Sequence, residues 1–214
     1  MFFPILSNQL LVTLDGSILA TGGRGKVLYL FSSETYEPIV EPIHLDGRIW
    51  GIDFSPPELP PPGTASDKDV VNAKSAHNSN LAVASGSDVA IIFDAKFQPC
   101  LQVHRPRTAR CLKYHPNLPI LAIGDGSGQV AIVDYENEET IKEFCAGSRV
   151  NTVDFSPRGD FLVVGTDECL FTMYETTVRI FRSRHTPGTP SSCFPPKMPL
   201  NQIIFCFNIN RRIK

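Results

Sequence analysis

Apolar and polar positions between residues 8 and 183 follow the pattern of short strands. Hydrophobic residues alternate with polar ones or run in fours and fives, and Gly, Asp, Ser or Pro bounds each run. No stretch of useful length shows the three- and four-residue spacing of an amphipathic helix. Because the runs are rich in Val, Ile and Phe, as in "VAIIF" and "FLVVG", the pattern predicts an all-β chain of short strands joined by tight turns.

The same succession of strands recurs along the chain. Three expected first strands end in a proline: "IWGIDFSP" at Pro56, "ARCLKYHP" at Pro116 and "VNTVDFSP" at Pro157. The last two prolines are 41 residues apart and the first two are 60 apart, because a Pro-, Ser- and Asp-rich insertion lies at residues 57–79. Three more apolar runs follow each first strand. The chain therefore repeats a four-stranded unit of about 41 residues.

We expect four such units followed by a tail. The units occupy residues 8–46, 47–105, 106–147 and 148–183, with the insertion inside the second. The first strand of the first unit spans roughly Gln9 to Leu14, and the last unit ends in "TVRIFRS". Residues 184–214 form a proline-rich linker and a short apolar stretch with a basic end, "NQIIFCFNINRRIK". That stretch is either an edge strand completing a unit or sequence outside the domain.

The repeat resembles the blade of a WD40-repeat β-propeller. The resemblance covers residues 8–183 and rests on the two "DFSP" turns, on "LAVASGS" and "LAIGDGSG", and on "IIFDA". In the last of these, Phe93–Asp94 stands at the Trp-Asp position of the family. The resemblance implies an all-β fold: a partial β-propeller of about four four-stranded blades with an irregular C-terminal tail.

Two features depart from the family pattern. No Gly-His pair precedes a first strand, and the other Trp-Asp positions hold Phe31–Ser32, Asp134–Tyr135 and Tyr174–Glu175. The His/Trp/Asp hydrogen-bond relay of the family is therefore not expected. The family usually closes its ring with about seven blades, and an open arc leaves strand edges and sheet faces uncovered. We expect a fragment of a longer protein; the alternative is that another chain supplies the missing blades.

Composition excludes several classes of protein. Twenty Lys and Arg residues face 22 Asp and Glu, so no overall basic field favours nucleic acid or a membrane surface. The six cysteines contain no Cys-x-x-Cys pair and fit reduced thiols better than a disulfide framework. The amino terminus lacks the basic region of a signal peptide, and no apolar run reaches the ~20 residues of a membrane helix. A cytoplasmic or nuclear protein is expected.

The pattern closest to a metal site is Cys100, His104, Cys111 and His115. Residues four apart on a strand lie about 13 Å from each other, and the two pairs fall on different blades, so we predict no zinc site. Asp53 and Asp154 occupy the same place in two repeats and are expected to cap turns by accepting hydrogen bonds from backbone amides. No nucleophile, base and orienting acid can be grouped, so no enzyme activity and no cofactor are predicted.

Three arginines are the first candidate binding residues. Arg105, Arg107 and Arg110 lie in "HRPRTAR", at the junction of the second and third units. The resemblance implies that this junction lies on the face most used for ligands. The three guanidinium groups could hold an acidic peptide or a phosphorylated partner bidentately. The alternative is an ordinary charged rim that only tunes association rates.

The insertion is the second candidate. In "PPELPPPG", Pro57, Pro60, Pro61 and Pro62 favour an extended polyproline conformation, which aromatic grooves of the SH3 and WW kind accept. A solvated spacer loop is the favoured alternative.

The resemblance implies a non-catalytic protein–protein interaction scaffold within a multiprotein complex. The competing hypotheses are a propeller that binds nucleic acid or phosphoinositide through Arg105, Arg107 and Arg110, and a regulatory domain of a larger protein.

Overall fold

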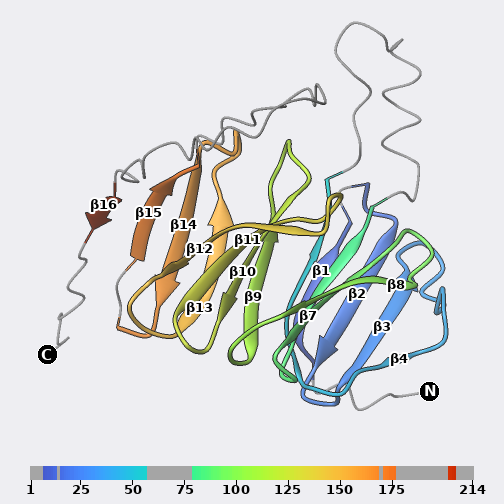
Figure 1. Ribbon diagram of the computed structural model, residues 1–214. Coiled ribbons are helices and arrows are strands. Elements are labelled where there is room, and N and C mark those ends of the chain that lie inside the picture. Colours follow the sequence, from blue (N-terminus) through green and yellow to red (C-terminus); the bar gives the residue numbers. More distant parts are fainter. Residues whose placement is uncertain (1–6, 14, 57–78, 169–170, 177–201, 206–214) are drawn as a thin grey trace, which may run out of the picture.

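The computed structural model describes residues 7–13, 15–56, 79–168, 171–176 and 202–205. The strands of these residues form four antiparallel sheets of four strands each (Figure 1). The first sheet contains β1 (Ser7–Val12), β2 (Ile18–Gly23), β3 (Val27–Ser32) and β4 (Ile43–His44). The second contains β5 (Ile49–Phe54), β6 (Leu81–Ser85), β7 (Val89–Phe93) and β8 (Pro99–His104).

The third and fourth sheets repeat this order. The third contains β9 (Ala109–Tyr114), β10 (Ile120–Asp125), β11 (Gln129–Asp134) and β12 (Glu139–Cys145). The fourth contains β13 (Val150–Phe155), β14 (Phe161–Thr166), β15 (Phe171–Glu175) and β16 (Gln202–Phe205). The part of the chain that the structure describes contains no helix long and apolar enough to cross a membrane.

The sheets follow one another as separate blades. In each sheet the strands pair in chain order, and the first strands of consecutive sheets, β1, β5, β9 and β13, lie in contact. The first and fourth sheets lie on opposite sides of Figure 1, with the second and third between them. This arrangement confirms the expected all-β fold, an arc of four propeller blades.

Pairing registers show that the repeats are equivalent in three dimensions. One leucine of each second strand lies opposite the last residue of the first strand: Leu19 opposite Val12, Leu81 opposite Phe54, Leu121 opposite Tyr114 and Leu162 opposite Phe155. Side chains alternate between the two faces of a strand, so this shared register places matching residues of every blade on matching faces.

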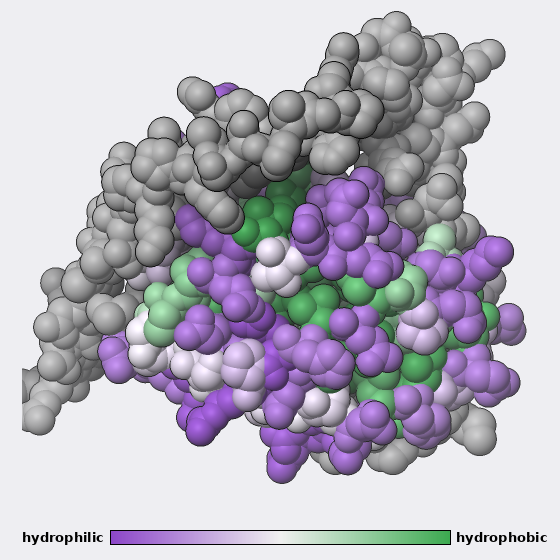
Figure 2. Space-filling view, in the orientation of Figure 1, coloured by the Kyte–Doolittle hydropathy of each residue, from purple (hydrophilic) through white to green (hydrophobic). Residues whose placement is uncertain are grey.

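Three hydrophobic cores lie between neighbouring blades. Ala20, Leu28 and Leu30 of the first sheet pack on the second sheet, and Ala82, Ala90 and Ile92 of the second pack on the third. Ala122, Val130 and Ile132 of the third pack on the fourth. A blade is therefore stabilised by burial against its neighbours. Figure 2 shows hydrophobic side chains that still reach the surface over the first sheet.

Details differ from the sequence expectation at the two ends. β1 covers Ser7–Val12 and so begins two residues before the expected Gln9, and β4 is only two residues long. The fourth strand expected at residues 177–183 lies outside the described residues. Gln202–Phe205 pairs with β15 as the fourth strand of the last sheet, the first of the two roles considered for this stretch.

Candidate binding faces

The ends of the strands form two faces of the arc. The junction face contains the segments that join one sheet to the next, residues 45–48, 105–108 and 146–149, together with the turns between second and third strands. Backbone hydrogen bonds join each junction segment to the turn between the second and third strands of the next sheet, as from Gly86 N to Arg48 O (2.7 Å) and from Gly126 N to Thr108 O (2.9 Å). The opposite, turn face contains the turns between first and second strands.

A β-bulge opens every first strand on the junction face. The pairing register shifts by one residue there, and the extra residues are Asn8, Trp50, Arg110 and Asn151. A bulge bends the strand and changes the direction of a side chain, and bulges are frequent beside functional sites. The last three lie six residues before Pro56, Pro116 and Pro157. The repeat therefore presents one residue per blade at the same place.

These residues contact one another across the blades. The guanidinium carbon of Arg110 lies 4.6 Å from the centre of the Trp50 ring, and that of Arg48 lies 4.9 Å from it. Arg110 Nη2 donates a hydrogen bond to Asn151 Oδ1 (3.0 Å), and Asn151 Nδ2 donates to Asp167 Oδ1. Cation–π contacts hold both arginines against one aromatic side chain. We call Trp50, Arg110 and Asn151 the bulge row.

The three arginines expected at the junction do not act together. Arg105 is buried: Nη2 lies 3.2 Å from Asp125 Oδ2, and Nη1 lies 2.5 Å from Glu143 Oε1. Arg107 is exposed, and Arg110 is half-buried in the bulge row. The expectation that Arg105 binds a partner is wrong, because its side chain is 2% exposed and two carboxylates already hold it.

Asp125 is a structural residue that the sequence analysis missed. Its Oδ1 accepts hydrogen bonds from Ser127 N (2.8 Å), Ser127 Oγ (2.6 Å) and Gln129 N (3.0 Å), while its Oδ2 faces Arg105. The carboxylate therefore holds the β10–β11 turn and fastens the β8–β9 junction to it. Its place in "GDGSG" was a signal, because Asp caps turns of this kind.

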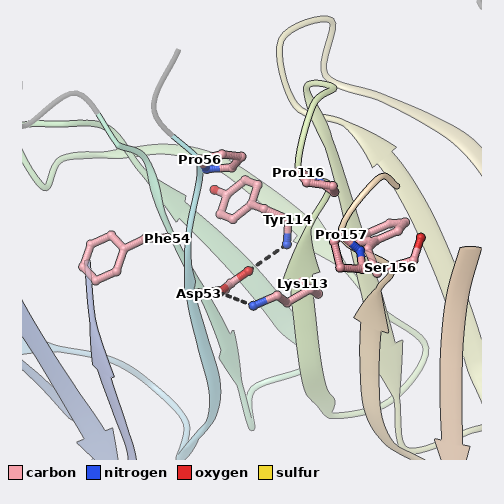
Figure 3. A pocket seen from close by; sticks show the side chains of 9 residues that line it. Asp53, Phe54, Pro56, Lys113, Tyr114, Pro116, Ser156 and Pro157 are labelled. Atoms are coloured by element: carbon pink, nitrogen blue, oxygen red, sulfur yellow. Dashed lines mark hydrogen bonds and ion pairs between the residues drawn. The ribbon is translucent and has the colours of Figure 1, made fainter. Parts of the chain in front are cut away.

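A hollow of about 180 Å³ lies on the turn face across three blades (Figure 3). It is lined by Asp53, Phe54, Pro56, Lys113, Tyr114, Pro116, Phe155, Ser156 and Pro157. The three prolines close the three first strands, so the hollow is a product of the repeat. Aromatic rings and proline rings make most of its wall apolar.

Asp53 links two blades and does not cap its own turn. Its Oδ2 accepts a hydrogen bond from Tyr114 N (2.8 Å), and its Oδ1 lies 3.0 Å from Lys113 Nζ, as Figure 3 shows. Burial raises the pKa of Asp53, although both partners favour the ionised form. Asp154 is exposed and accepts only from the adjacent Phe155 N (3.0 Å) in the described structure. In the described structure neither carboxylate therefore caps its own turn: Asp53 bonds to the next blade, and Asp154 bonds to a neighbour within β13.

The four residues of the metal-like pattern, Cys100, His104, Cys111 and His115, are divided between two sheets. Cys100 and His104 lie in β8, Cys111 lies in β9, and His115 follows β9. Burial raises the pKa of Cys111 to about 12. His115 Nδ1 accepts hydrogen bonds from Asn117 N and Leu118 N (both 3.1 Å), and Nε2 lies 3.1 Å from Gly159 O. This set of partners fits a neutral imidazole with its proton on Nε2.

The proline candidates cannot be placed. Pro57, Pro60, Pro61 and Pro62 lie outside the described residues. The ends of the insertion are described, and they are held together: Ser55 N donates to Asn80 O (2.8 Å) and Asn80 N donates to Ser55 Oγ (2.8 Å).

Comparisons with known proteins agree with this architecture. Residues 79–157 match the family described as the anaphase-promoting complex subunit 4 WD40 domain. Residues 138–181 match the family described as the WD domain, G-beta repeat. No curated protein matches the chain. Both matched families consist of WD40 repeats, and the structure shows four blades of the matching kind. The chain therefore belongs to the WD40-repeat family.

Proposed function

We propose that this chain is a non-catalytic interaction module that binds an acidic segment of a partner protein on its junction face. WD40 repeats generally mediate protein–protein interactions. The bulge row is the observation that carries the choice of face. In this row Arg110 stacks on Trp50, and Arg48 of the preceding junction stacks on the same ring, so two cationic groups lie beside one aromatic side chain.

The chemistry of the bulge row favours carboxylates or phosphates as ligands. A guanidinium stacked on an aromatic ring is held in place, and its N–H edge stays available for bidentate hydrogen bonds. Arg110 is half-buried beside Trp50, and Arg107 is exposed nearby in the same junction. A partner with one aromatic or aliphatic residue beside acidic ones would cover Trp50 and pair with the arginines.

Membership in a larger assembly is part of the proposal. One matched family is a domain of a subunit of the anaphase-promoting complex. This match supports the proposal that this chain, too, acts within a multiprotein complex. The cysteine pattern supports a cytoplasmic or nuclear location.

The test compares peptide binding by matched variants. An array of acidic and phosphorylated peptides identifies a probe, and fluorescence anisotropy then measures its Kd. Arg110→Gln should weaken binding about tenfold, because one charge-assisted contact of this kind contributes about 1.4 kcal/mol. Lys142→Gln is the control, since it makes the same charge change at an exposed residue of the outer strand β12. Equal weakening by both variants would show a non-specific charge effect and contradict the proposal.

A second candidate function is binding of nucleic acid or phosphoinositide. Exposed Arg24, Lys26 and Arg107 near the junction face favour it, whereas the net charge of −2 does not. Binding of RNA, or of vesicles containing phosphoinositide, that falls steeply with salt would support this candidate. Binding of the acidic peptide probe without binding of RNA or of such vesicles would support the first.

A further inference from the structure

Among the residues that the structure describes, one face of the first sheet is not packed against another sheet as its equivalents are. Leu10 is 67% exposed and Val12 is 47% exposed. The residues equivalent to Leu10 in the other three sheets, Ile52, Leu112 and Val153, are at most 7% exposed. Leu19 is half-buried, whereas its equivalents Leu81, Leu121 and Leu162 are at most 1% exposed.

The other three sheets show what covers such a face. Ile52 and Leu81 pack on the first sheet, Leu112 and Leu121 on the second, and Val153 and Leu162 on the third. In each case the covering element is the opposite face of a preceding four-stranded sheet. We call the face that meets the preceding sheet the back face, and the face that meets the following sheet the front face. The back face of the first sheet carries Leu10, Val12, Leu19, Tyr29 and Phe31.

The front face of the fourth sheet likewise packs on no other sheet within the described part of the chain. In the fourth sheet, Val163 of the second strand pairs with Met173 of the third strand. The equivalent pairs in the first three sheets each contain an alanine: Ala20 with Leu30, Ala82 with Ile92 and Ala122 with Ile132. The alanines are fully buried under the next blade, whereas Val163 and Met173 are half-buried and the adjacent Phe161 is 37% exposed. The first and fourth sheets lie at opposite ends of the arc, so neither covers the other (Figure 1).

A second observation points the same way. Asp53 at the front of the second sheet accepts a hydrogen bond from Tyr114 N in the next first strand. Asp154 is its equivalent in the fourth sheet, and it is exposed with a bond only to its own strand neighbour in the described structure. The fourth sheet thus has, in Asp154, an aspartate at the position from which Asp53 accepts a hydrogen bond from the following blade.

We propose that two copies of this chain join end to end, with the front face of the fourth sheet of each on the back face of the first sheet of the other. Two such junctions related by a twofold axis close a ring of eight blades, within the four to eight that propellers contain. The second copy is the occupant because the chain itself holds both halves of the contact. Such a ring leaves no blade face uncovered.

The test measures the mass of the 214-residue chain by light scattering and sedimentation at micromolar concentration. The wild type should have twice the mass of the 23.6 kDa chain. Leu10→Glu should be monomeric, and because Leu10 is 67% exposed this variant should keep its fold and melting profile. Ile141→Glu is the control: Ile141 is 46% exposed on the outer strand β12, and the variant should remain dimeric.

A mixing experiment separates this head-to-tail contact from a symmetric one. Met173→Glu should also be monomeric alone. A mixture of Leu10→Glu and Met173→Glu chains should form a dimer, because one of its two junctions joins two intact faces. A monomeric wild type, as expected if further blades of a longer chain cover these faces, would overturn the proposal. Open-ended oligomers, or a dimer that Leu10→Glu leaves intact, would overturn it too.

Discussion

Residues at the same place in the repeat have different roles because their neighbours differ. Asp53 and Asp154 share the motif "DFSP", yet the first reaches the next blade and the second stays at the surface. Gly16 and Gly159 occupy the same turn in the first and fourth sheets, with φ of +75° and +80°. Only Gly159 touches another blade, through His115. The repeat sets the backbone, and the adjacent sheet sets the role of the side chain.

The two glycines predict different costs for the same substitution. Gly16→Ala should lower the free energy of unfolding by about 1 kcal/mol, because positive φ disfavours a side chain. Gly159→Ala should cost about 1–3 kcal/mol more, because an added Cβ would overlap the imidazole of His115. Urea denaturation of both variants measures the difference. Equal costs would mean that the ring of His115 moves aside freely.

His115 predicts a pH dependence of stability. Burial lowers the pKa of His115 below its usual value near 6.5. The unfolded chain therefore binds the proton first, and stability is lost as the pH falls through about 6.5. His115→Asn should reduce the loss of unfolding free energy between about pH 7.5 and about pH 5.5, because it removes this proton uptake. Identical pH profiles for wild type and variant would contradict this role.

At the scale of elements, each blade is tied to the segment that precedes it. The Gly86–Arg48 and Gly126–Thr108 backbone bonds recur between junctions and turns, and the Arg105–Asp125 ion pair adds to the tie in the third blade. The His/Trp/Asp relay was not expected from the sequence. A buried arginine and aspartate connect the corresponding segments here.

The buried ion pair predicts unequal effects of two neighbouring arginines. Arg105→Ala should lower the free energy of unfolding by about 3 kcal/mol, since it leaves the buried carboxylate of Asp125 without its cation. Arg107→Ala should change it by less than about 0.5 kcal/mol, because Arg107 is exposed. Chemical denaturation checks both values. A large cost for Arg107 or none for Arg105 would reverse the assignment.

At the scale of the whole molecule, the arc has two unfilled ends and two different faces. The cores between blades need both sheets, so each end blade takes part in one such core and each inner blade in two. Association through the ends would supply the missing cover.

Closure by a second copy predicts that stability depends on concentration. The melting temperature of the wild type should rise with protein concentration, because association stabilises the folded state by mass action. Leu10→Glu should melt at one temperature at all concentrations. Differential scanning fluorimetry over a dilution series measures both. A wild-type melting temperature that does not change with dilution would contradict dimer formation.

Much of the fold followed from local patterns, and little of the site did. Turn residues and alternation revealed the strands, and the prolines at Pro56, Pro116 and Pro157 revealed the period. The same alignment would have placed Trp50, Arg110 and Asn151 together, six residues before each proline. The role of Arg105 was hidden, because its carboxylate partners lie 20 and 38 residues away in sequence and nothing local marks them.

The sequence by itself determined four repeats of a blade-like unit, while the strand that completes the last sheet, Gln202–Phe205, was left open between two roles. This information is local, since strand periodicity and turn chemistry act over a few residues. Only the tertiary structure decided which arginine is buried, which aspartate bridges two blades and which sheet face stays exposed. Those outcomes depend on the neighbouring sheet across each core, and a repeated sequence cannot show which of its copies has a neighbour.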